Sequence, residues 1–365
     1  MKILFDETGT VEGLEKVLNQ ATAEKIEGLM IFSCDANEFS PEKIDKILKN
    51  ISVPVFGGIF PEIIFENRKY AKGTSLLVLQ DHQINIQVIE NMSDEQTDIA
   101  QEIQNSSTEE FKTMFVYVDA FSTSIETLIS ELYYEFGLEN NFIGGGAGSL
   151  SFVQKPVIFT NKGLLQDAAV LASVQCNSAI GVKHGWNKVA GPFQITKSNK
   201  NTVEELDYKP AFEVYKEVVE AHSGQKFSDE NFFDIAKAYP FGVSKLGSEN
   251  VVRDPISMEN GALVCVGNVT TDDYVDILNG DVDTLINAAG EAASKAFEQS
   301  SEHNVIVFID CISRVLFLQD DFQKELDIVS NQNKQMIGAL TLGEIANTGQ
   351  DYLEFYNKTA VVGTF

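Results

Sequence analysis

The amino-acid sequence predicts a layered α/β protein with mixed sheets, two domains and three repeated βαβαβββ-like units. Short apolar runs, typical of buried strands, alternate with amphipathic segments, typical of helices, and the same order of segments occurs three times. A length of 365 residues is enough for two hydrophobic cores. Successive strands at the end of each copy require some antiparallel pairing, so we expect mixed sheets.

The first copy begins with the apolar run 29–34, which predicts a buried strand. Ser40 as N-cap and Pro41 at the first helical position then predict the start of a helix. The chain returns through 53–58, and the apolar run 75–79 predicts a closing strand.

The second copy has the same order. The run 114–119 predicts a strand, and a capping box of Thr123 and Glu126 predicts the start of a helix. The glycine-rich segment 142–148 predicts either a tight turn between strands or a backbone in contact with a ligand, because glycine permits both.

The third copy has a predicted strand at 305–311, a helix containing 322–329, a glycine-containing segment at 336–345 and a last strand at 359–363. A helix precedes every copy. In the second and third copies, a strand precedes that helix.

The stretch 183–267 follows a different pattern, with predicted helices near 210–221 and 229–239. The polar run 199–202 indicates a break near Glu205. We therefore predict an N-terminal domain with two units and a C-terminal domain with a helical insertion and the third unit. These two domains span residues 1–205 and 206–365.

The composition is strongly acidic, with 27 Lys and Arg residues against 54 Asp and Glu residues and a formal net charge of −27. Nucleic acids and anionic membranes bind basic surfaces, so this charge disfavours both partners. No apolar run reaches the roughly 20 residues of a membrane-spanning helix, and the first residues lack a signal-peptide pattern. We expect a soluble cytoplasmic protein.

The four cysteines and four histidines are dispersed along the chain. No CxxC pair or HxH spacing is present, so we expect no metal site and no resident cofactor. His184, close to the only tryptophan, Trp186, is either packed at a domain junction or, alternatively, an axial haem ligand.

Polar residues follow predicted strands, where crevices form in α/β layers. Asp119 and Ser122 in the second copy, and Asp310 in the third copy, are therefore candidate ligand-binding residues, with helix capping as the alternative. The remaining candidates are Gly144, Gly145, Gly146, Thr341, Glu344 and Asn357.

Arg253 is a further candidate, because the chain has few cations and a guanidinium group binds a carboxylate through two hydrogen bonds. The alternative for Arg253 is an ordinary salt bridge. The glycine spacing at 144–148 differs from the GxGxxG dinucleotide fingerprint.

Several short motifs, in this order, resemble the FIST family over nearly the whole chain. They are Gly144–Gly148, His184-Gly185-Trp186, Glu205–Ala211, Arg253-Asp254-Pro255, Gly338–Ile345 and Tyr356–Thr359. The resemblance implies an N-terminal and a C-terminal FIST region in an intracellular sensory module for small ligands such as amino acids.

The resemblance also implies coupling to signalling output. No kinase, cyclase or chemoreceptor segment follows the last motif, so we expect output through a separate protein of one of these types. Some relatives are similar to haem-binding nitric oxide sensors, which keeps haem bound by His184 as an alternative.

We therefore predict a sensor that binds a small polar, amino-acid-like ligand between the two FIST regions. A hydrolase that uses a strand-end Asp, Ser or Cys is the alternative from another class. No base stands at a recognisable spacing from a nucleophile, so the sequence favours the sensor over the enzyme.

Overall fold

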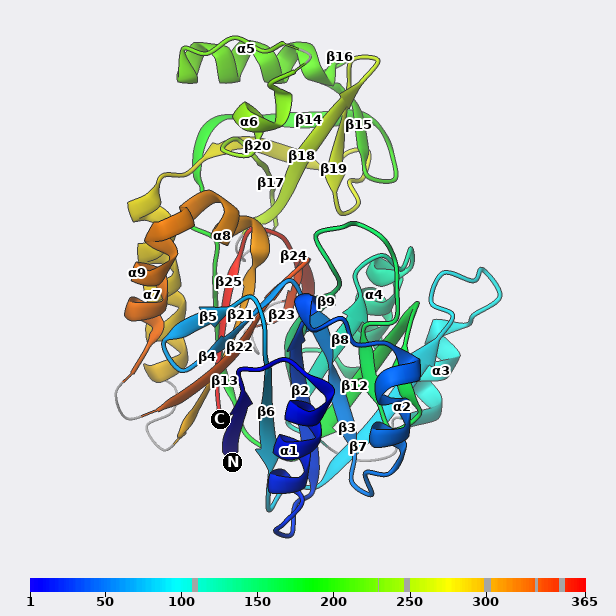
Figure 1. The fold of residues 1–365 in the computed structure, drawn as a ribbon. Coiled ribbons are helices and arrows are strands. Elements are labelled where there is room, and N and C mark those ends of the chain that lie inside the picture. Colours follow the sequence, from blue (N-terminus) through cyan, green and yellow to red (C-terminus); the bar gives the residue numbers. More distant parts are fainter. Residues whose placement is uncertain (107–110, 229, 246–249, 299–302, 332–333, 348–351) are drawn as a thin grey trace.

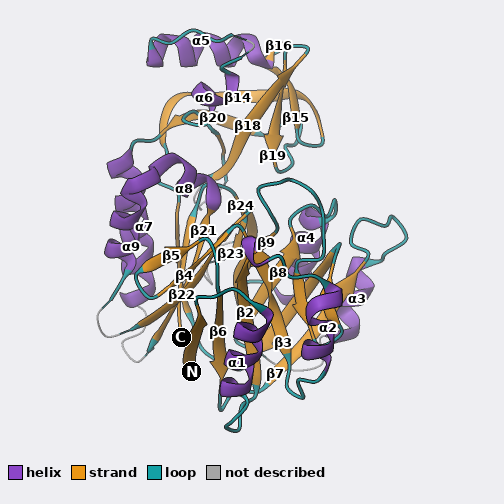
Figure 2. Ribbon diagram, viewed as in Figure 1, coloured by secondary structure: helices purple, strands orange, loops and turns teal. Residues whose placement is uncertain are grey.

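The chain forms a large body that carries a smaller lobe at one end (Figure 1). The computed structural model describes all residues except 107–110, 229, 246–249, 299–302, 332–333 and 348–351. The lobe consists of 187–279, and the body consists of the residues before and after it. Helices of the body cover the outside of its strands (Figure 2).

The body contains three units with a common order of elements. The first unit has β1 (Lys2–Asp6), α1 (Val11–Ala21), β2 (Gly28–Cys34), α2 (Pro41–Lys49), β3 (Val55–Phe60), β4 (Glu62–Phe65), β5 (Arg68–Tyr70) and β6 (Thr74–Leu79). The second unit has β7 (Ile84–Glu90), α3 (Ile99–Ser106), β8 (Thr113–Asp119), α4 (Ile125–Phe136), β9 (Asn141–Ala147), β10 (Ile158–Thr160), β11 (Gly163–Leu165) and β12 (Ala168–Val174). The third unit has β13 (Ala179–Lys183), α7 (Val282–Glu298), β21 (Val305–Cys311), α8 (Ile312–Leu318), α9 (Phe322–Val329), β22 (Gln335–Thr341), β23 (Glu344–Ala346), β24 (Glu354–Tyr356) and β25 (Ala360–Thr364).

Each unit builds four strands of one sheet and receives a hairpin from another unit. The strand orders are β1-β6-β2-β3-β10-β11, β7-β12-β8-β9-β23-β24 and β13-β25-β21-β22-β4-β5. The first unit therefore receives its hairpin from the second, the second from the third and the third from the first. Because this exchange is cyclic, no unit can leave the body without breaking strand pairs in two sheets.

The sheets are mixed, as the sequence predicts. β2 and β3 are parallel, and so are the corresponding pairs in the other two units, while the remaining neighbours are antiparallel. Aromatic rings join the units at the centre, with 5.6 Å between the ring centroids of Phe56 and Phe115 and 5.1 Å between those of Phe115 and Phe365. One hydrophobic cluster contains residues of all three units, and two further clusters lie mainly in the third and the second unit.

The glycine-rich segment of the second unit is a strand, so the prediction of a tight turn at 142–148 was wrong. Gly57, Gly144 and Gly338 occupy equivalent positions in β3, β9 and β22. A Cβ atom there would lie 2.0, 1.7 and 2.2 Å from a carbonyl oxygen of the neighbouring parallel strand. Those oxygens belong to Ile31, Val116 and Phe308. Glycine is required because a side chain would collide with backbone.

The lobe lies between β13 and α7, inside the third unit. It has β14 (Asn187–Asn199), β15 (Thr202–Leu206), β16 (Lys209–Pro210), α5 (Ala211–Ser223), α6 (Phe232–Ala236), β17 (Phe241–Val243), β18 (Val251–Glu259), β19 (Ala262–Val266) and β20 (Tyr274–Asn279). The helix predicted near 210–221 is α5, and the one near 229–239 is the shorter α6. Strands form most of the lobe, so the description of this region as a helical insertion was incomplete.

Strands from both sides of Glu205 share sheets, because β13 pairs with β25 and β4 pairs with β22. The division of the chain into 1–205 and 206–365 remains a prediction. A strand also precedes the first helix of the first unit, at β1, where the sequence analysis predicted none.

Candidate functional site

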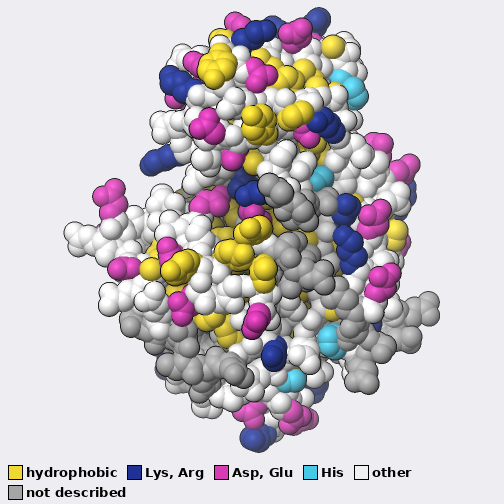
Figure 3. Space-filling view, turned by 180° about the vertical axis from the view of Figure 1, so that it is seen from behind, with side chains coloured by type: hydrophobic (Ala, Val, Ile, Leu, Met, Phe, Trp, Pro, Cys, Tyr) yellow, Lys and Arg dark blue, Asp and Glu magenta, His cyan; other side chains and the backbone are white. Residues whose placement is uncertain are grey.

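The lobe meets the body along a contact that we call the seam, formed by Glu126, Trp186, Arg253, Asp254 and Lys358. Seen from behind, hydrophobic side chains lie at the level where lobe and body meet, with basic and acidic side chains beside them (Figure 3). β18 brings Arg253 and Asp254 to the seam from the lobe, and α4 brings Glu126 from the body.

Arg253 connects the lobe to the body through its guanidinium group and is 5% exposed. Its Nε donates to the carbonyl oxygen of Asn268 at 2.8 Å, and its Nη1 donates to those of Val252 and Phe355 at 3.2 and 3.0 Å. Its Nη2 lies 3.1 Å from Oε1 of Glu126. The structure therefore contains the salt bridge that the sequence left open as the alternative for Arg253.

Lys358 makes the second charged contact across the seam and is buried. Its Nζ lies 3.1 Å from Oδ2 of Asp254, donates to the carbonyl oxygen of Lys237 at 3.0 Å and lies 5.0 Å from the ring centroid of Trp186. Burial raises the pKa of Asp254, although the ammonium group of Lys358 acts in the opposite direction. The other oxygen of Asp254, Oδ1, has no hydrogen-bond partner among the described residues.

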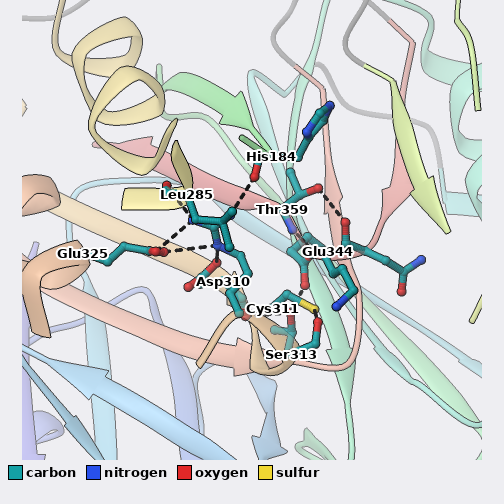
Figure 4. A network of polar contacts seen from close by, with 12 residues as sticks. His184, Leu285, Asp310, Cys311, Ser313, Glu325, Glu344 and Thr359 are labelled. Carbon is teal, nitrogen blue, oxygen red and sulfur yellow. Dashed lines mark hydrogen bonds and ion pairs between the residues drawn. The ribbon is translucent and has the colours of Figure 1, made fainter. Parts of the chain in front are cut away.

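A buried arginine of the body, Arg314, joins several residues that are labelled in Figure 4. Its Nε lies 3.0 Å from Oδ1 of Asp310, and its Nη2 lies 2.8 Å from Oε2 of Glu325. It also donates to the carbonyl oxygens of His184 and Leu285, at 2.8 and 3.0 Å. Burial and the nearby carboxylate of Glu325 hold the pKa of Asp310 well above its ordinary value.

His184 lies in the linker between β13 and the lobe. Its Nδ1 accepts a hydrogen bond from the backbone N–H of Trp186 at 2.8 Å, and the indole Nε1 of Trp186 donates to the carbonyl oxygen of Lys358 at 3.2 Å. Because Arg314 binds the carbonyl of His184, this linker joins the buried network of the body to the seam.

Glu344 is the centre of a second buried group. Its Oε1 accepts from Thr341 Oγ1 at 2.9 Å, and its Oε2 accepts from the backbone N–H of Thr359 at 3.2 Å. Burial raises the pKa of Glu344 to about 8, against these hydrogen bonds, which lower it. Glu344 is paired with Gly145 across β23 and β9, so the fold brings these predicted residues together.

Asp119 and Ser122 belong to a third group, at the end of β8. Asp119 Oδ2 accepts from the backbone N–H of Asp167 at 2.7 Å and from Gln154 Nε2 at 2.9 Å. Ser122 Oγ donates to Oδ1 of Asp167 at 2.7 Å. Burial raises the pKa of Asp119. These partners differ from those around Glu344 and Arg253.

The predicted residues are thus divided among several environments. Asn357, with two long hydrogen bonds of 3.5 Å from Nδ2 to carbonyl oxygens of the lobe, lies at the seam with Arg253. Asp310 is buried and paired with Arg314. Gly144 and Gly146 lie in the packed strand β9. A ligand-binding role for all of these residues remains a prediction.

Sequence reasoning missed four charged residues that form ion pairs at the seam or inside the body: Glu126, Arg314, Glu325 and Lys358. Charged residues on a helix are typical of a solvated surface, and Glu126 and Glu325 lie on α4 and α9. Two features of the sequence could have pointed to the ion pair of Arg314. It is one of few cations, and it follows Asp310 by four residues.

No group of three or more His, Cys, Asp or Glu side chains suited to a metal ion occurs in the described part of the chain. In that same part, no helix has the length and apolar character that a membrane crossing requires.

Comparison with known protein families gives two matches. The model of the FIST N domain matches residues 28–209, and the model of the FIST C domain matches residues 211–347. Together they cover most of the chain and both sides of the seam. No curated protein matches the chain at a significant level.

Proposed function

The chain belongs to the FIST family, whose domains are associated with sensing in signal transduction, and we propose that it binds a small polar ligand at the seam. In this proposal the ligand changes how the lobe sits on the body, and a separate protein reads the change. The ligand carries a carboxylate and at least one N–H or O–H donor, as an amino-acid-like metabolite does.

The salt bridge between Arg253 and Glu126 is the observation that carries the proposal. It joins a lobe residue to a body residue through a carboxylate, which is the group that a guanidinium fork binds best. The side chain of Glu126 is 32% exposed, whereas that of Arg253 is 6% exposed. A ligand carboxylate can therefore approach from the solvent side and replace Glu126.

Such a replacement provides the difference in affinity that a sensor needs. A ligand shifts a conformational equilibrium only if it binds one state more tightly than the other. With Glu126 on Arg253, the lobe is held to the body. With a ligand carboxylate on Arg253, that contact is absent, so the ligand favours a state in which the lobe is released.

Asp254 supports the second expected feature of the ligand, an N–H or O–H donor group. Its buried Oδ1 has no partner among the described residues, and a buried acceptor without a donor costs free energy. Lys358 already binds Oδ2 of Asp254, so Oδ1 is the acceptor that is left for the donor group of the ligand.

The enzyme alternative has less support. Burial raises the pKa of the Cys34 thiol to about 12, and it raises the pKa of the Cys311 thiol further. Thiolate nucleophiles require the opposite shift. For His184, the hydrogen bonds of its Nδ1 and its carbonyl support a structural role in the linker.

Isothermal titration calorimetry with small carboxylic acids and their matching amides tests the proposal. We expect an acid to bind, its amide to bind much more weakly, and Arg253→Ala to abolish binding while the circular dichroism spectrum is retained. Arg68→Ala, which removes an exposed arginine of β5, is the matched control and should bind normally. Equal binding of acid and amide, or unchanged affinity in folded Arg253→Ala, contradicts the proposal.

A further inference from the structure

The turn between β24 and β25, which we call the connector, binds the lobe from the body. It consists of Asn357, Lys358 and Thr359. Lys358 makes the ion pair with Asp254 at 3.1 Å and donates to the carbonyl oxygen of Lys237 at 3.0 Å. Nδ2 of Asn357 lies 3.5 Å from two further carbonyl oxygens of the lobe. A displacement of the connector therefore breaks contacts with the lobe.

The backbone of the connector is strained at its centre. Lys358 has a φ of 52°, in the left-handed region that residues with a side chain rarely adopt. Such a conformation persists only where the surrounding structure holds it. Within the connector, Oγ1 of Thr359 donates to the carbonyl oxygen of Asn357 at 2.8 Å. Further restraints come from the lobe on one side and from the body on the other.

Glu344 holds the connector from the body side. It is fully buried, and its Oε2 accepts from the backbone N–H of Thr359 at 3.2 Å (Figure 4). Thr359 directly follows Lys358, which binds Asp254 of the lobe. One peptide unit thus separates the residue that binds the buried carboxyl group from the residue that makes the charged contact of the seam.

The groups that face Glu344 come from β9, β21, β22, β24 and α8. The hydroxyl of Thr341 and the thiol of Cys311 donate to the carboxylate, and the charge of Arg314 attracts it. The charge of Asp310 repels it. Gly145 and Tyr356 are its partners in the two neighbouring strands. Burial outweighs the groups that favour the charge and raises the pKa of Glu344 to about 8.

We propose that Glu344 is a positioning residue that regulates the seam: with a proton on Glu344 the connector holds the lobe on the body, and loss of that proton favours the released lobe. This inference rests on the proposed function in taking the released lobe as the state that the ligand favours. It goes beyond that function because it assigns a second input, the proton concentration, to the same movement.

The direction of the effect follows from the access of water to Glu344. With the lobe in place the carboxyl group is buried, and an ionised carboxylate there lacks the hydration that it has in water. Release of the lobe frees the connector from Asp254 and gives water a path to Glu344, where the carboxyl group ionises nearer its ordinary pKa of 4.5.

Between pH 4.5 and about pH 8, release of the lobe is therefore accompanied by loss of a proton from Glu344. The contribution of Glu344 to holding the lobe is complete below pH 4.5 and is lost as the pH rises through about 8. Ligand binding favours the same released state, so proton loss and ligand binding should promote each other. A carboxylate ligand should bind the seam more tightly above pH 8 than below it.

The only tryptophan of the chain reports on the connector. Trp186 is 4% exposed, and its indole N–H donates to the carbonyl oxygen of Lys358 at 3.2 Å. We titrate the tryptophan fluorescence of the full chain from about pH 6.5 to about pH 9.5. The emission should move to longer wavelength with a midpoint near pH 8, because release of the lobe brings the indole into water.

Two matched variants assign the transition. Glu344→Gln removes the titrating group, so the emission should stay constant over the same pH range. Glu62→Gln makes the same change in the first unit, because Glu62 begins β4 as Glu344 begins β23. The carboxylate of Glu62 pairs with Lys69 at 2.7 Å, and this variant should titrate like the wild-type chain.

Hydrogen exchange of the wild-type chain gives a second measurement that needs no variant, in case Glu344→Gln fails to fold. The rates are corrected for the intrinsic dependence of amide exchange on pH. Amides of β18 and α6 in the lobe should lose protection as the pH rises through 8, whereas those of β2 and β8 in the body should keep it.

Three results would overturn the inference. The first is a tryptophan emission and a lobe protection that stay constant over the titration of the wild-type chain. The second is the same transition in Glu344→Gln, which assigns it to another group such as His184, whose Nδ1 accepts from the backbone N–H of Trp186. The third is equal loss of protection in the lobe and the body. These measurements contain no carboxylic acid, so their failure is distinguishable from failure of the calorimetric test on Arg253.

Discussion

The body and the lobe are held together in different ways. In the body, each sheet contains a hairpin from another unit, so backbone hydrogen bonds lock the three units into one structure. The lobe is one inserted sheet, and side chains such as Arg253 and Lys358 attach it to the body. Because strand pairing joins the units of the body while side chains join the lobe to it, the proposed function assigns the ligand-dependent movement to the lobe.

The largest effect should come from the centre of the body. Arg314→Met leaves Asp310 and Glu325 buried without their counter-charge, and breaking a buried ion network in this way costs about 3–5 kcal/mol. Urea denaturation followed by circular dichroism measures the loss. Arg68→Ala is the control for removing an arginine. A loss below about 1 kcal/mol would show that the network does not stabilise the body.

A methyl group in the strand β9 should give the next largest effect. Gly144→Ala places a Cβ where the Val116 carbonyl oxygen would be 1.7 Å away, and we expect a loss of about 3 kcal/mol in the free energy of unfolding. Gly224→Ala, where nothing lies within 4 Å and the backbone is in the left-handed helical region, should lose only about 1 kcal/mol. Equal losses would refute the role of close strand packing.

Loss of the charge at the seam should loosen the lobe and leave the body intact. Lys358→Met removes the partner of Asp254, but burial already raises the pKa of Asp254, so this carboxyl can take up a proton. We expect a cost of about 2 kcal/mol. Hydrogen exchange should accelerate in the lobe and stay unchanged in the three body sheets. Uniform acceleration in both parts would contradict the distinction.

Stability should fall as the pH rises, through Glu344. The unfolded carboxyl ionises near its ordinary pKa of 4.5, whereas the folded one keeps its proton up to about 8. Between these values unfolding releases a proton, so the favourable contribution is complete below pH 4.5 and is lost by about pH 8. The slope is at most about 1.4 kcal/mol per pH unit.

Glu344→Gln tests this slope, because the amide has the shape of the protonated acid and does not titrate. Urea unfolding between pH 5.5 and 7.5 should show a smaller decline in the variant than in the wild-type chain. Asp310, whose pKa is also raised, contributes in the same direction and leaves a residual slope. Identical slopes in the two proteins would show that Glu344 is ionised in the fold.

Local patterns were sufficient to predict the main elements of the body. The apolar runs at β2, β8 and β21 and the helix starts at Pro41 and near Glu126 are visible in the sequence. The exchange of hairpins is not visible, because pairing between distant strands leaves no periodic signal in either of them. The glycines of β9 resembled a turn for the same reason, since the backbone that requires them comes from another strand.

The candidate site was less predictable than the fold. Arg253 was found because cations are rare in this chain, yet its carboxylate partner Glu126 looks like a surface residue of a helix. The burial of Lys358 follows from contact with Asp254 and Trp186, two residues distant in sequence. Only the folded chain shows that these groups meet at one seam.

Movement of the lobe relative to the body is the central claim, and a distance between spin labels measures it directly. Tyr208 of the lobe and Tyr134 of the body are each 80% exposed, and the four native cysteines are buried, so cysteines at these two positions can be labelled selectively. Electron–electron double resonance should give one main distance for the otherwise wild-type chain. Glu126→Gln should populate a second distance, because the contact that holds the lobe is weakened. A single, identical distance in both proteins would contradict the account.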